Sequence, residues 1–255
     1  MLRLWHSTPM CRLCLSRRTL LAVSPVLPLL PPRPDKPVEP HLRLANAPPD
    51  RLTVALTFDA CPGAFDWRIA QALVTGGMPA TIFLTGLWLQ RNPDGLAFLL
   101  SHRDLFAFEN HGELHIPPVL GRGTIFGIPV ASDLETVRHE VTAGAAAITA
   151  ATATTPHWYR AAAGYYTPSV IPEIQKLGFG IGGYSLSADA GASLPAHSVA
   201  RRMAGAANGD IIVAHINQPA RPSGEGVVAG IKALQRRGAN FVRLDTLAPN
   251  DLAAV

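Results

Sequence analysis

The chain has 255 residues, of which 48% are apolar and 16% charged, so it suits one folded domain and excludes the disordered, collagen-like and coiled-coil classes. Its three cysteines are too few for a disulfide framework. Residues 1–47 hold seven of the 22 Lys and Arg residues and two of the 18 Asp and Glu residues. The rest of the chain is therefore nearly neutral, and a nucleic-acid partner is not expected.

The N-terminal region has the pattern of a targeting segment. Residues 16–21 read Ser-Arg-Arg-Thr-Leu-Leu and resemble a twin-arginine export signal. The apolar stretch over residues 20–30 is short and interrupted by prolines, so it is not expected to span a membrane stably. The proline-rich residues 31–50 predict an extended linker. We expect a signal peptide and linker over 1–47, a domain over 48–255, and export to the periplasm. A disordered basic N-terminus is the alternative interpretation.

Beyond residue 50, short apolar runs alternate with amphipathic segments. Seven runs are expected to form strands, over residues 52–58, 80–84, 105–109, 157–160, 179–184, 210–214 and 240–244. Helices are expected over residues 66–74, on either side of Pro93, and over 133–150, 169–177, 198–206 and 227–237. This alternation predicts an α/β domain with a parallel sheet, because each parallel neighbour needs a crossover. An open doubly wound sheet and a nearly closed barrel both fit.

Polar side chains follow five of the expected strands. In parallel α/β folds the functional site lies at the carboxyl ends of the strands. The groups found there are Asp59, the segment 110–115, Arg160, Ser187 with Asp189, and His215. A spacing of four places His111 and His115 on one face of a helical turn, where both imidazoles can bind one metal ion. The alternative to a metal site is that His111 and His115 are unrelated histidines of a loop.

Together these segments resemble the polysaccharide deacetylase family, the NodB-homology domain of carbohydrate esterase family 4. The resemblance covers roughly residues 50–245. It rests on Thr57-Phe58-Asp59, His111-Gly112-Glu113-Leu114-His115, Arg160, Asp189 and Ile212-Val213-Ala214-His215, in that order.

The resemblance implies a single-domain, distorted (β/α) barrel of about seven strands and metal-dependent removal of acetyl groups from a carbohydrate. It also implies a role for each matching residue. Asp59 is the general base on a water that the metal activates, and His215 is the general acid. His111 and His115 hold a divalent ion, with zinc preferred. Arg160 and Asp189 hold Asp59 in place.

The chain departs from the family pattern at two places. Ala60 stands where the family has a second Asp that binds the metal, so the third ligand is open between Asp59, Cys61 and Asp66. A small apolar role for Cys61 is the competing interpretation. After Arg160 the expected Pro and aromatic residue are displaced by the segment 161–166.

Several aromatic residues flank the expected strand ends, where they can either stack on sugars or pack in the core: Phe58, Trp88, Trp158, Tyr165 and Tyr166. Two alternatives to a metal-dependent deacetylase stay open. One is an inactive glycan-binding module on the same fold. The other is a cysteine hydrolase that uses Cys61 with His111 or His215. The oligomeric state is not determined by the sequence.

Overall fold

A computed structural model describes residues 36–255 of the chain, without the side chain of Pro249. The twin-arginine motif and the apolar stretch expected over residues 16–30 lie outside this range. Within it, no helix is both long and apolar enough to cross a membrane.

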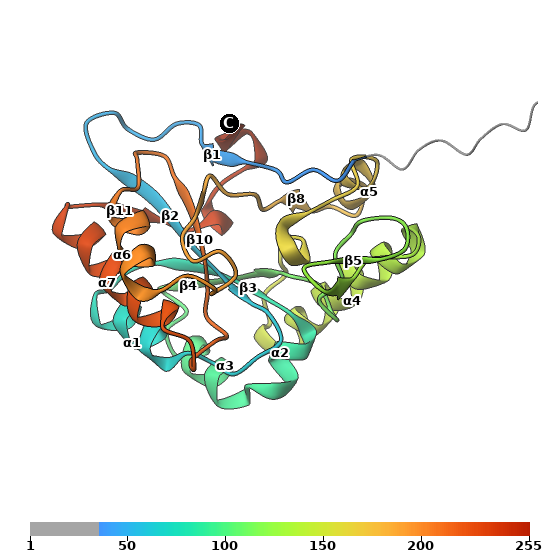
Figure 1. Ribbon diagram of the computed structural model, residues 1–255, viewed down its shortest axis with the longest axis horizontal. Helices are drawn as coiled ribbons and strands as arrows, with labels where there is room; N and C mark the ends of the chain where they lie inside the picture. Colours follow the sequence, from blue (N-terminus) through green and yellow to red (C-terminus); the bar gives the residue numbers. More distant parts are fainter. Residues whose placement is uncertain (1–35) are drawn as a thin grey trace, which may run out of the picture. The chain divides into compact units, whose positions relative to one another are not determined.

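The centre of the domain is a parallel sheet of eight strands, curled into a half-barrel (Figure 1). Seven strands follow one another in the order β8-β7-β4-β3-β2-β10-β9, and β11 pairs with the start of β2. Their bounds are β2 Thr53–Ala60, β3 Ala80–Leu84, β4 Phe106–Asn110, β7 Trp158–Tyr159, β8 Gly180–Ile181, β9 Leu186–Ser187, β10 Ile211–His215 and β11 Asn240–Val242. The expected α/β barrel is therefore confirmed. All seven expected strands form, and within this parallel sheet the two-residue strand β9 is the one that the sequence patterns did not predict.

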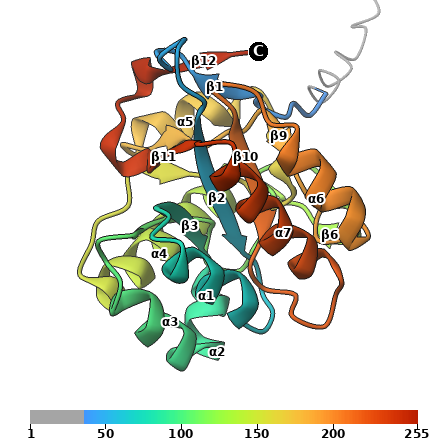
Figure 2. The same ribbon diagram turned by 90° about the vertical axis from the view of Figure 1, so that its left-hand side faces the viewer.

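Seven helices in the described part of the chain connect these strands and cover the sheet (Figure 2). They are α1 Trp67–Thr75, α2 Gly86–Arg91, α3 Pro93–Leu100, α4 Leu134–Thr152, α5 Val170–Lys176, α6 Ala196–Ala204 and α7 Ser223–Arg236. Pro93 begins α3, a position where its missing N–H costs nothing. The side chain of Asp133 caps α4 by accepting the N–H of Thr136.

Side chains of β2 alternate between two environments, because the strand is pleated. Val54, Leu56, Phe58 and Ala60 pack in the main apolar cluster, which includes side chains of α1 and α7. The alternate residues face the interior of the half-barrel, because successive side chains of a strand point to opposite sides. Asp59 belongs to this second set. It therefore reaches the interior at the carboxyl end of the strand, where a site is expected.

Residues 36–47 pack onto the barrel, although the sequence assigns them to the leader and linker. Strand β1 (Leu42–Leu44) pairs antiparallel with β12 (Leu252–Ala254), and Arg43 forms an ion pair with Asp210 at 3.1 Å. Figure 2 shows this strand pair crossing one end of the sheet. Val38 and Tyr166 exchange two backbone hydrogen bonds. The packed structure thus begins before the boundary expected at residue 47.

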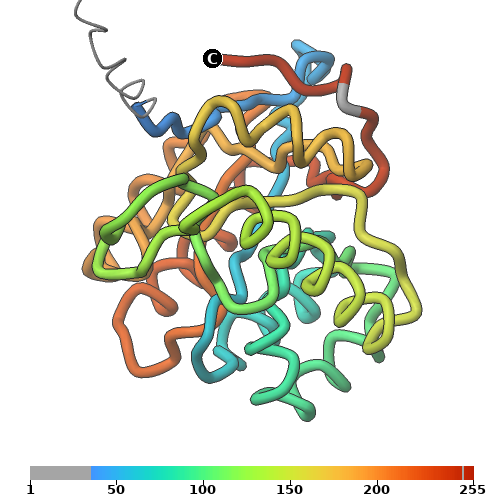
Figure 3. The backbone as a smooth tube through the Cα atoms, turned by 90° about the vertical axis from the view of Figure 1, so that its right-hand side faces the viewer, coloured from blue at the N-terminus to red at the C-terminus, as the bar shows by residue number. Residues whose placement is uncertain are grey.

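The two edges of the sheet are joined by a short piece of chain. Strands β8 and β9 are neighbours in sequence but lie at opposite edges of the sheet. Residues 182–185 connect them, and Figure 3 follows this segment in orange-yellow. The carbonyl oxygen of Gly182 accepts a hydrogen bond from Arg160 Nε at 2.7 Å. Gly183 packs so closely on the segment before β1 that an added Cβ would lie 2.5 Å from the Pro40 carbonyl oxygen.

The strand pair β1–β12 generates a prediction about stability. A chain beginning at residue 48 should be less stable than one beginning at residue 36 by about 2 kcal/mol, because it loses several partly buried hydrogen bonds. This corresponds to a fall of about 4 to 8 °C in Tm for a domain of this size. Arg43→Ala in the longer chain removes the partly exposed ion pair and one hydrogen bond to the Asn208 carbonyl oxygen but keeps the strand pair, so it should cost less, about 1 kcal/mol. Equal Tm values for the two chains would contradict a structural role for residues 36–47.

Glu109 generates a prediction about the pH dependence of stability. Burial raises the pKa of Glu109 from 4.5 to about 8. The hydrogen bonds that its Oε2 accepts from the N–H groups of Trp158 and His157 lower the pKa, but by less than burial raises it. Below pH 4.5 this carboxyl is protonated in both the folded and the unfolded chain. Between pH 4.5 and about 8 only the unfolded chain releases the proton, so the free energy of unfolding should fall by up to about 1.4 kcal/mol per pH unit.

Urea unfolding of the wild type and of Glu109→Gln across this pH range checks the prediction. The variant should lose this part of the pH dependence, whereas Glu135→Gln, at an exposed position on α4, should keep it. Parallel curves for the wild type and Glu109→Gln would contradict the assignment.

Candidate active site

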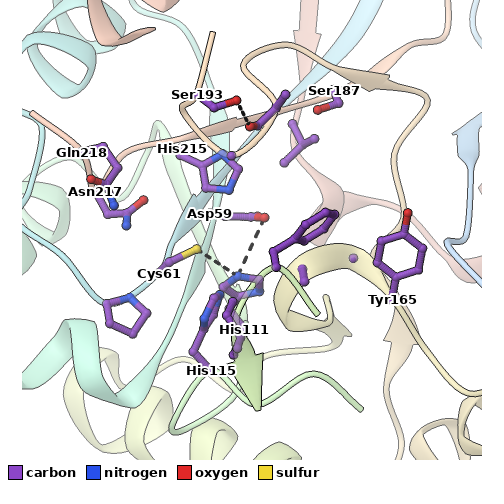
Figure 4. Close-up of a pocket in the computed structure, with 18 of the residues that line it drawn as sticks. Asp59, Cys61, His111, His115, Tyr165, Ser187, Ser193, His215, Asn217 and Gln218 are labelled. Atoms are coloured by element: carbon purple, nitrogen blue, oxygen red, sulfur yellow. Dashed lines mark hydrogen bonds and ion pairs between the residues drawn. The ribbon is translucent and has the colours of Figure 1, made fainter. Parts of the chain in front are cut away.

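A cavity of about 860 Å³ opens at the carboxyl ends of the central strands. Asp59, Cys61, His111, His115 and His215 all line it, although they come from segments far apart in the sequence (Figure 4). The structure thus brings together most of the candidate residues that the sequence singled out.

Asp59 is held by Arg160, which follows β7. Arg160 Nη1 donates to Asp59 Oδ1 at 2.8 Å and to Thr57 Oγ1 at 2.9 Å. The guanidinium carbon lies 4.0 Å from the centroid of the Phe83 ring, and the whole residue is buried. Burial by itself raises the pKa of Asp59, but the charges of Arg160, His111 and His215 outweigh it and keep the pKa below the usual value. Asp59 therefore stays ionised at neutral pH.

The other oxygen of Asp59 faces the histidines. Asp59 Oδ2 lies 3.8 Å from His111 Nε2, and Figure 4 shows Asp59 between His111 and His215. Because Oδ1 is bonded to Arg160, Oδ2 is the oxygen available to accept a proton.

His215, at the end of β10, is oriented by Asp189. Asp189 accepts the backbone N–H of His215 at 2.7 Å and contacts His215 Nδ1 at 2.9 Å. A carboxylate only accepts, so Nδ1 carries a proton and Nε2 is left for the cavity. Burial by itself lowers the pKa of His215, but the charge of Asp189 raises it well above the ordinary value.

This contact corrects the role expected for Asp189. The resemblance implied that Asp189 helps to hold Asp59, together with Arg160. In the structure Asp189 is bonded to His215 instead, and the side chain of Arg160 reaches Asp59, Thr57 and the carbonyl oxygens of residues 182 and 183.

His111 and His115 lie in a loop after β4, not on the helical turn that their spacing suggested. Gly112 and His115 adopt left-handed backbone conformations, with φ of 88° and 64°, which bring the two rings to a centroid distance of 5.0 Å. His111 Nδ1 contacts the carbonyl oxygen of Arg160 at 2.8 Å. A carbonyl accepts only, so this contact fixes the tautomer and leaves Nε2 free to bind a metal.

Glu140 of α4 holds the loop that carries these histidines. Its buried carboxylate accepts the N–H groups of Leu114 and Ile116 at 3.0 Å. Gly112 allows the approach, because a Cβ there would lie 2.2 Å from Glu140 Oε1. Burial raises the pKa of Glu140, although the backbone hydrogen bonds oppose this. In the sequence Glu140 is marked only as a charge on the apolar face of a helix, and this signal did not identify it as a site residue.

Three groups lie close enough to share a metal ion. Of the His, Cys, Asp and Glu residues that the structure describes, Cys61, His111 and His115 form such a group, with ligand atoms all within 4.8 Å of one another. His115 Nε2 is buried without a hydrogen-bond partner, which is the condition expected of a ligand atom. These residues therefore fit a divalent metal.

Two carboxylates considered as third ligands are not in this group. Asp59, which the resemblance also allowed as a ligand, contacts only His111 of the three. Asp66 caps α1 and forms an ion pair with Arg68 at 2.7 Å, and it does not line the cavity.

The wall of the cavity carries few aromatic groups. Of the five aromatic residues considered above, Tyr165 lines the cavity, and the others are buried in the core. Phe126, on the hairpin of β5 (Thr124–Ile125) and β6 (Ile128–Pro129), is 80% exposed and lies 6.1 Å from the Tyr165 ring. Tyr184 and Glu39 are hydrogen-bonded to each other on the same wall.

Comparisons with solved structures reveal a shared fold. A family 4 carbohydrate esterase from Streptomyces lividans, solved with acetate, is 19% identical, with a TM-score of 0.62 over 78% of this chain and 94% of that one. A peptidoglycan deacetylase from Bacillus subtilis is 20% identical, with a TM-score of 0.63 over 78% and 91%. A pseudoenzyme of carbohydrate esterase family 4 from Bacillus anthracis is 21% identical, with a TM-score of 0.60 over 78% and 66%.

A search of the curated proteins finds no match. The family model for polysaccharide deacetylases matches residues 46–182, more than half of the chain, and this range includes Asp59, His111, His115 and Arg160. The chain therefore belongs to the polysaccharide deacetylase family.

Proposed function

We propose that the protein is a metal-dependent hydrolase that removes N-acetyl or O-acetyl groups from a polysaccharide or oligosaccharide. One observation supports this most directly. A single cavity brings together three features: a carboxylate held by an arginine, a histidine held by a carboxylate, and a cluster of side chains able to bind a metal.

His111 and His115 would hold a divalent ion, for which we propose zinc. Such an ion lowers the pKa of a coordinated water and polarises the acetyl carbonyl. Asp59 Oδ2 accepts a proton from the attacking water. His215 donates a proton to the leaving nitrogen or oxygen as its bond to the acetyl carbon breaks, so the products are acetate and a free amine or hydroxyl. Arg160 keeps Asp59 ionised, and Asp189 keeps His215 oriented.

The substrate is proposed to lie along the open side of the cavity. Tyr165 and the exposed Phe126 offer apolar faces on which a sugar ring can stack. We also propose that the protein is exported to the periplasm, on the basis of the twin-arginine pattern at residues 16–21. The nearly neutral body gives no support for a nucleic-acid partner.

A glycan-binding module without activity is the first alternative. The buried pairs Asp59–Arg160 and His215–Asp189 argue against it, since sugar binding needs neither a base nor an acid held in this way. A cysteine hydrolase is the second alternative, and the 3.4 Å contact between Cys61 Sγ and His111 Nε2 favours it. Metal removal distinguishes these functions: a chelator should abolish acetate release by a metal hydrolase and leave that of a cysteine hydrolase unchanged.

Substitutions at Asp59 and His111 separate metal binding from catalysis. Asp59→Asn should retain the metal and lose at least about 100-fold in kcat, because the amide cannot accept the proton. His111→Ala should lose the metal as well as the activity. Metal content by mass spectrometry and acetate release from acetylated chito-oligosaccharides and acetylated xylan test both variants. Asp104→Asn, at an exposed position, serves as the matched control. A wild type that binds no metal after reconstitution would refute the proposal.

A substitution at Glu140 tests whether this residue positions the loop that carries His111 and His115. Glu140→Gln turns an amide toward backbone N–H groups that need an acceptor, so the histidine loop should loosen and the metal affinity should fall about 10- to 100-fold. Saturating metal should restore kcat, which distinguishes this effect from a general loss of stability. Competition with a chromophoric chelator measures the affinity, and Glu135→Gln on the same helix is the control. An unchanged affinity would rule out the positioning role.

A further inference from the structure

A cysteine lies next to Ala60, the position at which the family pattern has its second, metal-binding Asp. Ala60 is fully buried and packs in the apolar cluster, so it contributes nothing to the cavity. Cys61 follows directly, and its side chain lines the cavity as Asp59 does. Cys61 therefore places a thiol in the cavity one residue after the position where the family pattern has a carboxylate.

The spacing of the Cys61 sulfur suits metal binding. Cys61 Sγ lies 3.4 Å from His111 Nε2. Ligand bonds of about 2.3 Å for sulfur and 2.0–2.1 Å for nitrogen in a tetrahedral site separate these two atoms by about 3.6 Å. All pairs among the three ligand atoms lie within 4.8 Å, so closing them onto one ion requires side-chain movements of about 1 Å.

Neighbouring groups leave Cys61 free for this role. His111 Nδ1 is bonded to a carbonyl oxygen, and Asp59 Oδ1 is bonded to Arg160, so neither atom competes for an ion. Cys61 is also a free thiol and the single cysteine in residues 36–255, so no disulfide partner lies within this range.

We propose that the thiolate of Cys61 is the third protein ligand of the metal, with His111 and His115. This inference rests on the proposed function and goes beyond it. One sulfur and two imidazole nitrogens form a softer donor set than one carboxylate and two imidazoles. Such a set favours zinc and cobalt and disfavours manganese, magnesium and calcium. Binding releases the thiol proton, so the ion gains one anionic ligand and keeps an open position for water or substrate.

Cobalt substitution tests the sulfur ligand directly. The full chain is used with Cys11→Ser and Cys14→Ser, so that Cys61 is its one thiol. The metal-free protein is titrated with Co²⁺, and the absorption spectrum is recorded. We expect one equivalent to bind, with a thiolate-to-cobalt charge-transfer band in the near ultraviolet. In Cys61→Ser the band should vanish and the affinity should fall at least about 100-fold, beyond the loss caused by an outer-shell change.

Cys61→Asp provides the second arm. It should bind Co²⁺ with visible bands and no charge-transfer band, and its preference for manganese relative to zinc should rise. X-ray absorption at the zinc edge is then measured on the zinc-loaded chain with Cys11→Ser and Cys14→Ser, called the background protein, so the site itself carries no substitution. It should detect one sulfur at about 2.3 Å.

The outcomes separate the two proposals. The thiolate ligand would be overturned if Co²⁺ binds without a charge-transfer band and is lost in His111→Ala, and if the zinc edge shows nitrogen and oxygen ligands alone. The deacetylase proposal would stand in that case. No binding of Co²⁺ or Zn²⁺ in the background protein would overturn both.

Discussion

The buried contact between Arg160 and Asp59 is the interaction on which the rest of the site depends. Two charges taken out of water are stable only when they are paired and their remaining hydrogen-bonding groups are satisfied. Arg160 meets this condition by donating to Thr57, Asp59 and Gly182 while it stacks on the Phe83 ring. Its backbone carbonyl oxygen also fixes the ring of His111. One residue thus orients both the Asp59 carboxylate and the His111 imidazole, for which we propose metal binding, so the two side chains are positioned relative to each other by the same arginine.

A second constraint comes from the loop that carries the histidines. Its backbone turns into left-handed conformations at Gly112 and His115, which are unfavourable for residues other than glycine unless the surroundings impose them. Glu140 imposes them from one side through backbone hydrogen bonds. From the other side, the N–H groups of Gly86 and Leu87 at the start of α2 donate to loop carbonyl oxygens. The imidazoles are therefore positioned by two helices that the sheet itself holds in place.

The order of most strands and helices could be predicted from the sequence because short apolar runs alternate with longer amphipathic segments along the chain. Asp59, His111, Arg160 and His215 were identifiable because they follow those strands, and parallel strands bring such positions to one edge. The partner of Asp189 could not be predicted, since a strand-end carboxylate has several cations within reach. Glu140 was missed because its role comes from contacts with Leu114 and Ile116, which lie 26 and 24 residues earlier in the chain. Residues 36–47 were assigned to a linker because the stretch 31–50 is rich in proline, and the three-residue strand β1 carries too little pattern to oppose that assignment.

The short connection between β8 and β9 explains why the sheet curls. Ile181 and Leu186 end and begin strands at opposite edges, and five backbone steps separate them. Fully extended, those steps span at most about 18 Å. In a flat sheet the same two edges would be about 29 Å apart, since six spacings of about 4.8 Å separate seven strands. The connection is thus a tether too short for a flat sheet. The curvature that turns the strand ends toward one another follows from chain length as well as from the twist of the strands.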